Sequence, residues 1–225
     1  MRSIRSTSPE RAGALLTLLA LALAPQTSSA LSFEFAGTVE SVWVSSGFIG
    51  TLPFTAVVGE GGSGAGSFDP SASGTPTGTG ATDFLQTGQT LSLQVSGLDL
   101  TLPVVRANTS IETFATRFGL TASGEGQQAQ ALGVDRVEIL LGLVGGPGLL
   151  PVGVLPTELS ETVWDLRQQV LLRGWTQISV SNWSQSWLVA LEPLTVTVPE
   201  PDGAALLGGG LAALALHRRL RSIRR

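Results

Sequence analysis

The stretch SFEFAGTVESVWV, residues 32–44, decides the fold class of this chain. Its apolar residues Phe33, Phe35 and Val39 fall on one side of an extended chain, and Glu34 and Thr38 fall on the other. Alternation of this kind is typical of a β-strand with one buried face. A Ser-Ser-Gly turn follows, and then a second strand-like run, GFIGTLPFTAVV, at residues 47–58. The two runs together predict an opening hairpin.

Strand-like segments continue along the chain. The run LSLQVSGLDLTLPVV (91–105) places Leu91, Leu93 and Val95 in register, and further candidates are residues 111–124, 134–144, 168–175, 176–181 and 186–198. Short strands without a helix-length repeat predict an all-β fold, a single antiparallel β-sandwich or jelly-roll-like domain over residues 31–197. We expect six apolar residues in its core: Phe33, Phe35, Leu93, Val95, Ile139 and Leu141.

Two segments interrupt this pattern. Residues 59–84 are rich in Gly, Ser, Thr and Pro, which predicts a long loop or a ragged edge. Residues 156–169, PTELSETVWDLRQQ, fit two structures. A helix would gather four apolar side chains on one face (Leu159, Val163, Leu166 and Val170), whereas a strand would gather a different four (Trp164, Leu166, Val170 and Leu172). We favour a short helical turn followed by a strand.

The residue types that are missing restrict the chemistry. The chain has no Cys, Lys or Tyr, and its one histidine, His217, lies outside the domain of residues 31–197. Catalysis by Ser-His or Cys-His pairs and metal sites built on His or Cys are therefore excluded from that domain. Catalysis there would have to use carboxylates. We expect a non-enzymatic protein without cofactors.

The charge is unevenly distributed. The whole chain carries a formal charge of -4, but residues 31–199 hold fourteen carboxylates against five arginines, which is -9. A surface of that sign repels phosphate backbones, so we expect no nucleic-acid partner.

The first thirty residues have the order of a secretory signal peptide. A start with three arginines precedes the apolar run ALLTLLALALA (14–24), and Ser28 and Ala30 supply the small side chains that signal peptidase requires. We predict a signal peptide over residues 1–30, export through the Sec pathway, and cleavage after Ala30.

The other end combines a short apolar run with positive charge. Residues 204–216 carry no charge, and a helix of that length covers roughly 20 Å of a bilayer core of about 30 Å. We predict a short transmembrane helix at about 203–217. The positive-inside rule places the arginines that follow it in the cytoplasm as stop-transfer charges: Arg218, Arg219, Arg221, Arg224 and Arg225.

A short motif stands directly before this apolar run: Val198, Pro199, Glu200 and Pro201. The motif, the apolar run, the terminal arginines and the N-terminal signal peptide together resemble the PEP-CTERM sorting signal, with residues 198–225 matching it. In that family an exosortase, a membrane protease-transpeptidase of bacteria that make extracellular polysaccharide, processes the tail. The resemblance implies a protein that is transiently anchored in the inner membrane and then moves to the cell surface or extracellular matrix. Exosortase and exopolysaccharide are the partners it implies.

Two glycine-rich patterns suggest ligands. Residues 59–64 match a dinucleotide fingerprint, but more Gly, Ser and Pro follow where the pattern needs a helix. The same region resembles one turn of a calcium-binding nonapeptide repeat, with Gly66 where the ligand Asp belongs. Glu60, Asp69 and Asp83 remain as carboxylates able to bind calcium in another arrangement.

Three tryptophans near the end of the domain suggest a sugar-binding surface. Trp175, Trp183 and Trp187 share parity, so a single unbroken strand would place them on one face as candidate glycan contacts. Alternatively, a turn at Ser181 and Asn182 resets the register and lets the indoles enter the core, as large aromatic side chains usually do. We favour the second interpretation.

These observations favour one function and leave two alternatives. The favoured function is a non-enzymatic, exported protein of the cell surface or extracellular matrix, associated with exopolysaccharide or biofilm. The first alternative is a carbohydrate-binding module that uses a tryptophan face. The second is a glycoside hydrolase that works with two carboxylates.

Overall fold

The computed structural model describes residues 30–44, 54–160, 162–179 and 182–198 of this chain. The described residues form strands and one short helix, α2 (Gln127–Ala131). The strands are β1 (Leu31–Val44), β2 (Gly61–Phe68), β3 (Gly74–Gly78), β4 (Ala81–Leu85), β5 (Thr90–Val95), β6 (Leu98–Ile111), β7 (Thr116–Glu125), β8 (Arg136–Gly145), β9 (Arg167–Ser179) and β10 (Asn182–Thr197).

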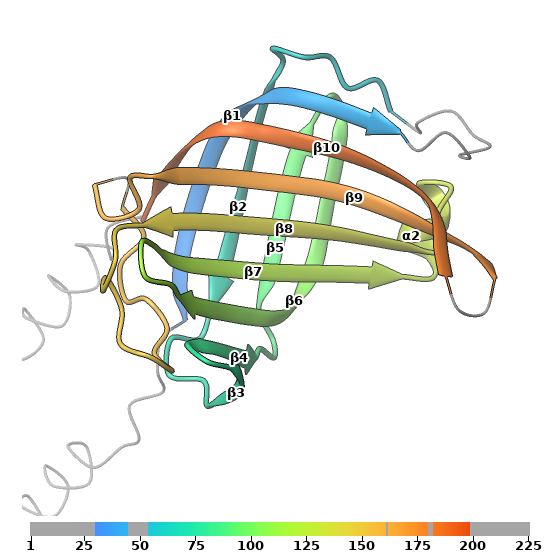
Figure 1. Ribbon diagram of the computed structural model, residues 1–225. Coiled ribbons are helices and arrows are strands. Elements are labelled where there is room, and N and C mark those ends of the chain that lie inside the picture. The colour runs from blue at the N-terminus through green and yellow to red at the C-terminus, as the bar shows by residue number, and fades with distance from the viewer. Residues whose placement is uncertain (1–29, 45–53, 161, 180–181, 199–225) are drawn as a thin grey trace, which may run out of the picture.

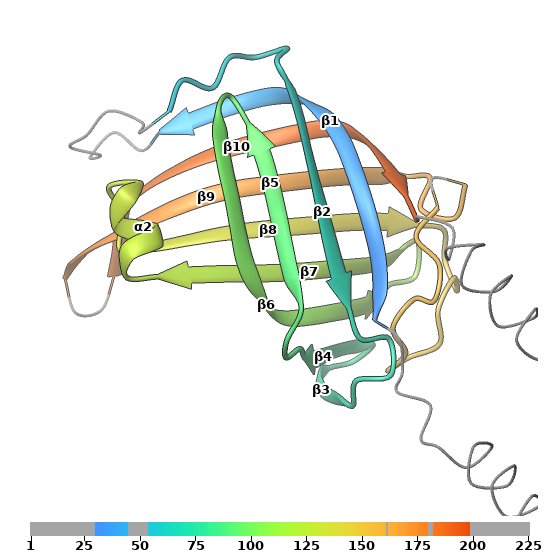
Figure 2. The same cartoon turned by 180° about the vertical axis from the view of Figure 1, so that it is seen from behind.

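Eight of these strands close into an antiparallel barrel (Figures 1 and 2). The order around the barrel is β1, β2, β5, β6, β7, β8, β9 and β10, and β10 pairs with β1. The all-β prediction is confirmed, but the sandwich or jelly-roll prediction is wrong. Alternation along a strand shows only which side of the strand is buried. The strands of a sandwich and those of a barrel have the same alternation. The difference lies in long-range pairing, which leaves the barrel without open edges among its eight strands.

Large side chains fill the inside of the barrel. Along β8, buried and partly exposed residues alternate throughout, as expected for a strand with one face inward. Five aromatic rings follow one another through the interior (Phe35, Phe33, Phe68, Phe118 and Trp164), and neighbouring centroids are 5.1–6.4 Å apart. All six residues predicted to lie in the core are buried. Their burial confirms the predicted inward face of each strand.

The glycine-rich segment differs from its prediction. Instead of a long loop or a ragged edge, residues 59–84 contain β2, β3 and most of β4, and β2 lies between β1 and β5. Gly64 and Gly66 are the cross-strand partners of Phe35 and Phe33. A Cβ on Gly66 would lie 2.5 Å from Cζ of Phe33 and 2.6 Å from Cδ1 of Leu91. The glycines therefore make room for the rings of β1, and large and small residues alternate across the ladder.

The first hairpin also differs. β1 pairs with β2 and β10, and the described part of the expected second arm, residues 54–58, is not a strand. Alternation in residues 47–58 did not identify the partner of β1, because the β2 glycines have no apolar side chains to reveal a strand.

One end of the barrel, on the left in Figure 1, carries both ends of the domain. Glu34 near the start of β1 pairs with Thr197 at the end of β10. The segment between β8 and β9 covers this end and buries Leu155, Leu159 and Trp164 in the core. Backbone N–H groups of Val163 and Trp164 donate to the Ser160 carbonyl, and β9 follows at Arg167. This agrees with the favoured turn followed by a strand, although Leu166 is exposed.

The opposite end, on the right in Figure 1, carries α2. Ala129 of α2 and the following Leu132 and Val134 are buried in the core.

β3 and β4 form a hairpin outside the barrel proper, where β4 pairs with the second half of β6. The exposed strand β3 contains Pro76, which limits its pairing with another chain.

Candidate functional site

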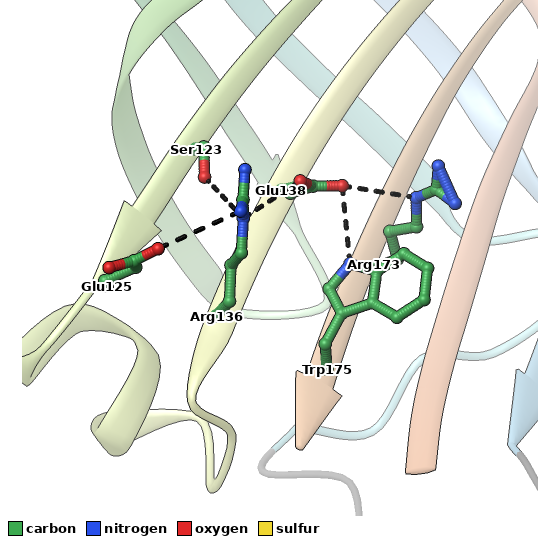
Figure 3. A network of polar contacts seen from close by, with 6 residues as sticks. All are labelled: Ser123, Glu125, Arg136, Glu138, Arg173 and Trp175. Carbon is green, nitrogen blue, oxygen red and sulfur yellow. Dashed lines mark hydrogen bonds and ion pairs between the residues drawn. The ribbon is translucent and has the colours of Figure 1, made fainter. Parts of the chain in front are cut away.

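The most connected polar cluster of the described residues lies on the outer wall of the barrel. Figure 3 shows its six members, from β7, β8 and β9: Ser123, Glu125, Arg136, Glu138, Arg173 and Trp175. Strand register brings them together, because Glu138 pairs with both Ser123 and Arg173, and Arg136 pairs with both Glu125 and Trp175. Their neighbours in β8, Val137 and Ile139, point into the core. The alternation that builds the core therefore also gathers the cluster.

Glu138 is the centre of the cluster. Its Oε1 lies 3.0 Å from Nε of Arg136, and its Oε2 lies 3.5 Å from Nε of Arg173. Oε2 also accepts a hydrogen bond of 3.3 Å from Nε1 of Trp175. Only 13% of the Glu138 side chain is exposed, so these contacts replace most of its water. Arg136 also donates to Oγ of Ser123 at 3.0 Å and lies 3.9 Å from Glu125.

Arg173 and Trp175 form a second contact within the cluster. The guanidinium carbon of Arg173 lies 4.7 Å from the centroid of the Trp175 ring, which is a cation–π arrangement. The ion pair with Glu138 holds the guanidinium, and the hydrogen bond to Glu138 holds the indole. One ring face of Trp175 is therefore covered by a cation.

The same register extends to an exposed tryptophan on β1. Trp43 pairs with Leu188 of β10, and Leu188 pairs with Arg173. Two interstrand spacings separate Trp43 from Arg173, which is about 10 Å. The Trp43 residue is 55% exposed. An open aromatic platform thus shares the outer wall with the Glu138 cluster.

This arrangement suits a neutral, polyhydroxylated ligand. An exposed indole packs against the C–H face of a sugar ring, and the cluster supplies fixed donors and acceptors within about 10 Å of it. The cluster does not have the arrangement of a glycosidase pair. Glu125 and Glu138 both lie beside Arg136 on the outer wall instead of facing each other across a cleft.

The tryptophan face considered as an alternative is divided in the structure, and the favoured burial of the indoles is wrong for Trp175, which lies in the outer-wall cluster. Residues 167–179 and 182–197 form two paired strands, so the unbroken strand that would align the three tryptophans is absent. In the backbone register Trp175 pairs with Ser186, and Trp187 pairs with Gly174. Trp175 and Trp187 therefore occupy adjacent rungs of the ladder between β9 and β10. The side chains of Trp183 and Trp187 lie outside the described residues. Sequence reasoning missed Trp43, because this residue has the same parity as the buried Phe33 and Val39. A register shift between Val39 and Ser41 of β1 reverses the alternation and leaves Trp43 exposed.

The three carboxylates considered for calcium lie apart. Glu60 lies directly before β2 and accepts a hydrogen bond from Ser96. Asp69 lies directly after β2 and accepts a hydrogen bond from Ser71. Asp83 lies in β4 and forms an ion pair with Arg106. The length of β2 alone separates Glu60 from Asp69 by on the order of 25 Å. Within the described ranges no three Asp, Glu or His residues are grouped closely enough to hold a metal ion.

A shallow depression runs along the outside of β2. Its two parts, of about 440 and 630 Å³, share Ala36, Ser63 and Gln94. The floor is low because the outward residues of β2 are small, and Glu34, Glu60 and Asp99 contribute negative charge to the walls. No cationic side chain lines either part among the described residues, so the depression disfavours anionic ligands.

The residues predicted for processing lie at or beyond the limits of the barrel. Ala30 is exposed directly before β1, and Val198, 41% exposed, directly follows β10. Pro199, Glu200, Pro201, the segment at 203–217 and the five terminal arginines lie outside the described residues. Among the helices that are described, none is long and apolar enough to cross a membrane.

Comparisons of this chain with protein-family models, with curated proteins and with solved structures gave no match.

Proposed function

We propose that this chain is an exported, non-enzymatic protein of the cell surface or extracellular matrix that an exosortase sorts through its C-terminal PEP-CTERM signal. The observation that carries the proposal is the order of features after the domain: Val198-Pro199-Glu200-Pro201, the apolar run, and five arginines. A signal peptide at the other end agrees with export of the domain between them.

The limits of the barrel support this proposal. The cleavage site expected after Ala30 falls immediately before β1, and the sorting motif begins immediately after β10. Both processing steps would therefore leave every barrel strand whole. Because core side chains fill the barrel, the domain is expected to remain folded after release.

The test is a pair of tail variants expressed with and without an exosortase and followed by intact-mass measurement. Changing Pro199, Glu200 and Pro201 to alanine leaves the apolar run and its topology nearly unchanged. This variant should therefore remain full-length and membrane-associated. Changing the five arginines to glutamine should instead reduce retention, because little then opposes movement of the tail across the bilayer. Normal processing of the triple-alanine variant would refute the sorting proposal.

A second candidate function is carbohydrate binding by the outer wall. The observation that favours it is the exposed Trp43 on the same wall as the Glu138 cluster. Exopolysaccharide is the corresponding ligand class. On a glycan array, Trp43→Ala should weaken binding at least tenfold, because it removes the stacking platform. Phe114→Ala is the matched control, since Phe114 is also an exposed aromatic residue but lies at the end of the barrel. Equal binding by Trp43→Ala and the parent chain would exclude this surface.

A further inference from the structure

Exposed apolar side chains gather at the end of the barrel where the domain starts and finishes. We call this the termini end; it comprises the β6–β7 turn (112–115), the β8–β9 segment (146–166), the start of β1 and the end of β10. Phe114 is 84% exposed, Val152 64%, Leu166 57%, and Val154 and Val198 each 41%. These side chains come from three separate parts of the chain, which the fold places on the left in Figure 1.

The exposed residues are supported by a fixed frame. The Glu112 N–H donates to the Ala115 carbonyl and closes the turn that carries Phe114. The Leu149 N–H donates to Oγ1 of Thr116 at 3.2 Å, which ties the β8–β9 segment to the first residue of β7. Trp164 anchors the same segment in the core. Phe114, Val152 and Val154 therefore project from loops whose bases are held.

We infer that the termini end rests on the lipid bilayer while the tail is inserted, with Phe114, Val152 and Leu166 in contact with the membrane interface. This inference rests on the proposed function, because it requires the apolar run at 204–216 to lie in the membrane. Five residues, 199–203, separate Val198 from that run. Fully extended, they span at most about 18 Å. β10 alone is about 50 Å long, so the tether is much shorter than the domain.

So short a tether determines how the barrel is oriented on the bilayer. It also determines how often the termini end contacts the membrane. The termini end must face the bilayer, and α2 at the opposite end must point away from it. A short flexible connection also gives an effective concentration on the order of millimolar, so weak apolar contacts with the interface become populated. Side chains of this kind lie at the boundary between headgroups and acyl chains, about 5–10 Å deep.

The charges at this end indicate which lipids are preferred. Arg117 is paired with Glu112 at 2.8 Å and Arg167 with Glu192 at 2.6 Å, which neutralises both arginines. Glu158 and Asp165, both exposed, then add negative charge to the same end. Contact should therefore be closer on neutral phosphatidylcholine than on vesicles that contain anionic phosphatidylglycerol.

The test uses the full chain and exploits its lack of cysteine. Single variants Phe114→Cys, Val152→Cys and Gln127→Cys are labelled with an environment-sensitive fluorophore and reconstituted into phosphatidylcholine vesicles. Gln127 is the control, because it is exposed in α2 at the opposite end. Quenchers attached to the lipid acyl chains and iodide in the water then report the surroundings of each label.

Labels at positions 114 and 152 should be quenched by the lipid-attached quencher and shielded at least threefold from iodide relative to position 127. Phosphatidylglycerol should weaken both effects. If position 114 is as accessible to iodide as position 127 in chains that float with the vesicles, the inference is wrong and the sorting proposal is unaffected. Shielding from iodide without lipid quenching would indicate a second copy of the chain and would also overturn it. If the chain does not float with the vesicles at all, the membrane tail of the proposed function fails.

Discussion

At the scale of single residues, the packing of the barrel depends on the inward glycines of β2 as much as on the phenylalanines that they face. Phe33 occupies the volume that a side chain on Gly66 would need, and Leu91 of β5 closes the other side. Gly61, in the same strand, has no atom within 4 Å of the corresponding Cβ position. The two glycines provide a matched comparison within one strand.

We predict that Gly66→Ala lowers the free energy of unfolding by about 2–3 kcal/mol, since Phe33 or the strand must move to admit the methyl group. Gly61→Ala should change it by less than about 1 kcal/mol, in the stabilising direction, because alanine reduces the freedom of the unfolded chain. Urea unfolding of both variants measures the difference. Equal effects at the two sites would contradict the packing of Phe33 against Gly66.

Glu138 is the second residue for which the structure makes a specific prediction. Glu138→Ala removes the ion-pair partner that Arg136 and Arg173 share and the acceptor of the Trp175 indole N–H. The expected loss of stability is about 1–2 kcal/mol, because about a third of each arginine side chain remains exposed to water. Glu138→Gln retains an acceptor for the indole and should lose less. Glu125→Ala is the control: this side chain is 71% exposed and 3.9 Å from Arg136, so a change below about 0.5 kcal/mol is expected.

At the scale of elements, the β8–β9 segment closes the termini end through one large side chain. Trp164 is 1% exposed, contacts Phe118 at a centroid distance of 6.0 Å, and donates its indole N–H to the Glu158 carbonyl at 3.1 Å. The segment has little regular structure of its own, so its order depends on this anchor.

Trp164→Ala should therefore cost about 3–5 kcal/mol, as expected for removal of a buried aromatic side chain. It should also make residues 146–166 sensitive to proteolysis before the barrel unfolds. Leu166→Ala, at an exposed position two residues away, should have little effect on either measurement. Urea titration and limited proteolysis with mass spectrometry test both expectations. Resistance of Trp164→Ala to both would show that the segment is held by other contacts.

At the scale of the whole molecule, the pairing of the first and last strands decides between a barrel and an open structure. Glu34 and Thr197 are direct partners across this seam, and both are exposed. Because the chain lacks cysteine, a pair introduced at these positions has no competing thiol.

The double variant Glu34→Cys/Thr197→Cys should form a disulfide under mild oxidation and raise the stability by up to about 4 kcal/mol, since it closes a very long loop. The pair Glu34→Cys/Gln127→Cys joins β1 to α2 at the opposite end and should stay reduced. Mass measurement after thiol alkylation distinguishes the two. Failure of the 34–197 pair to oxidise would argue against the closed barrel.

The sequence by itself determined the all-β class and the buried face of those strands whose apolar residues alternate. Alternation at Phe33 and Phe35, at Leu93 and Val95, and at Ile139 and Leu141 is a local property, so it predicted these core residues and the all-β class. The sorting proposal likewise rests on the order of sequence features at both ends, which can be read without the fold.

Only the tertiary structure decided which strands meet. Closure of the barrel depends on pairing between β6 and β7 and between β10 and β1, and the second pair is separated by most of the chain. β2 was predicted as a loop because glycine has low intrinsic strand propensity; the rings of β1 and the neighbouring β5 give it its place. The same holds for the outer wall. Trp43, Arg173 and Glu138 are distant in sequence, and they share a surface because strand register places them side by side.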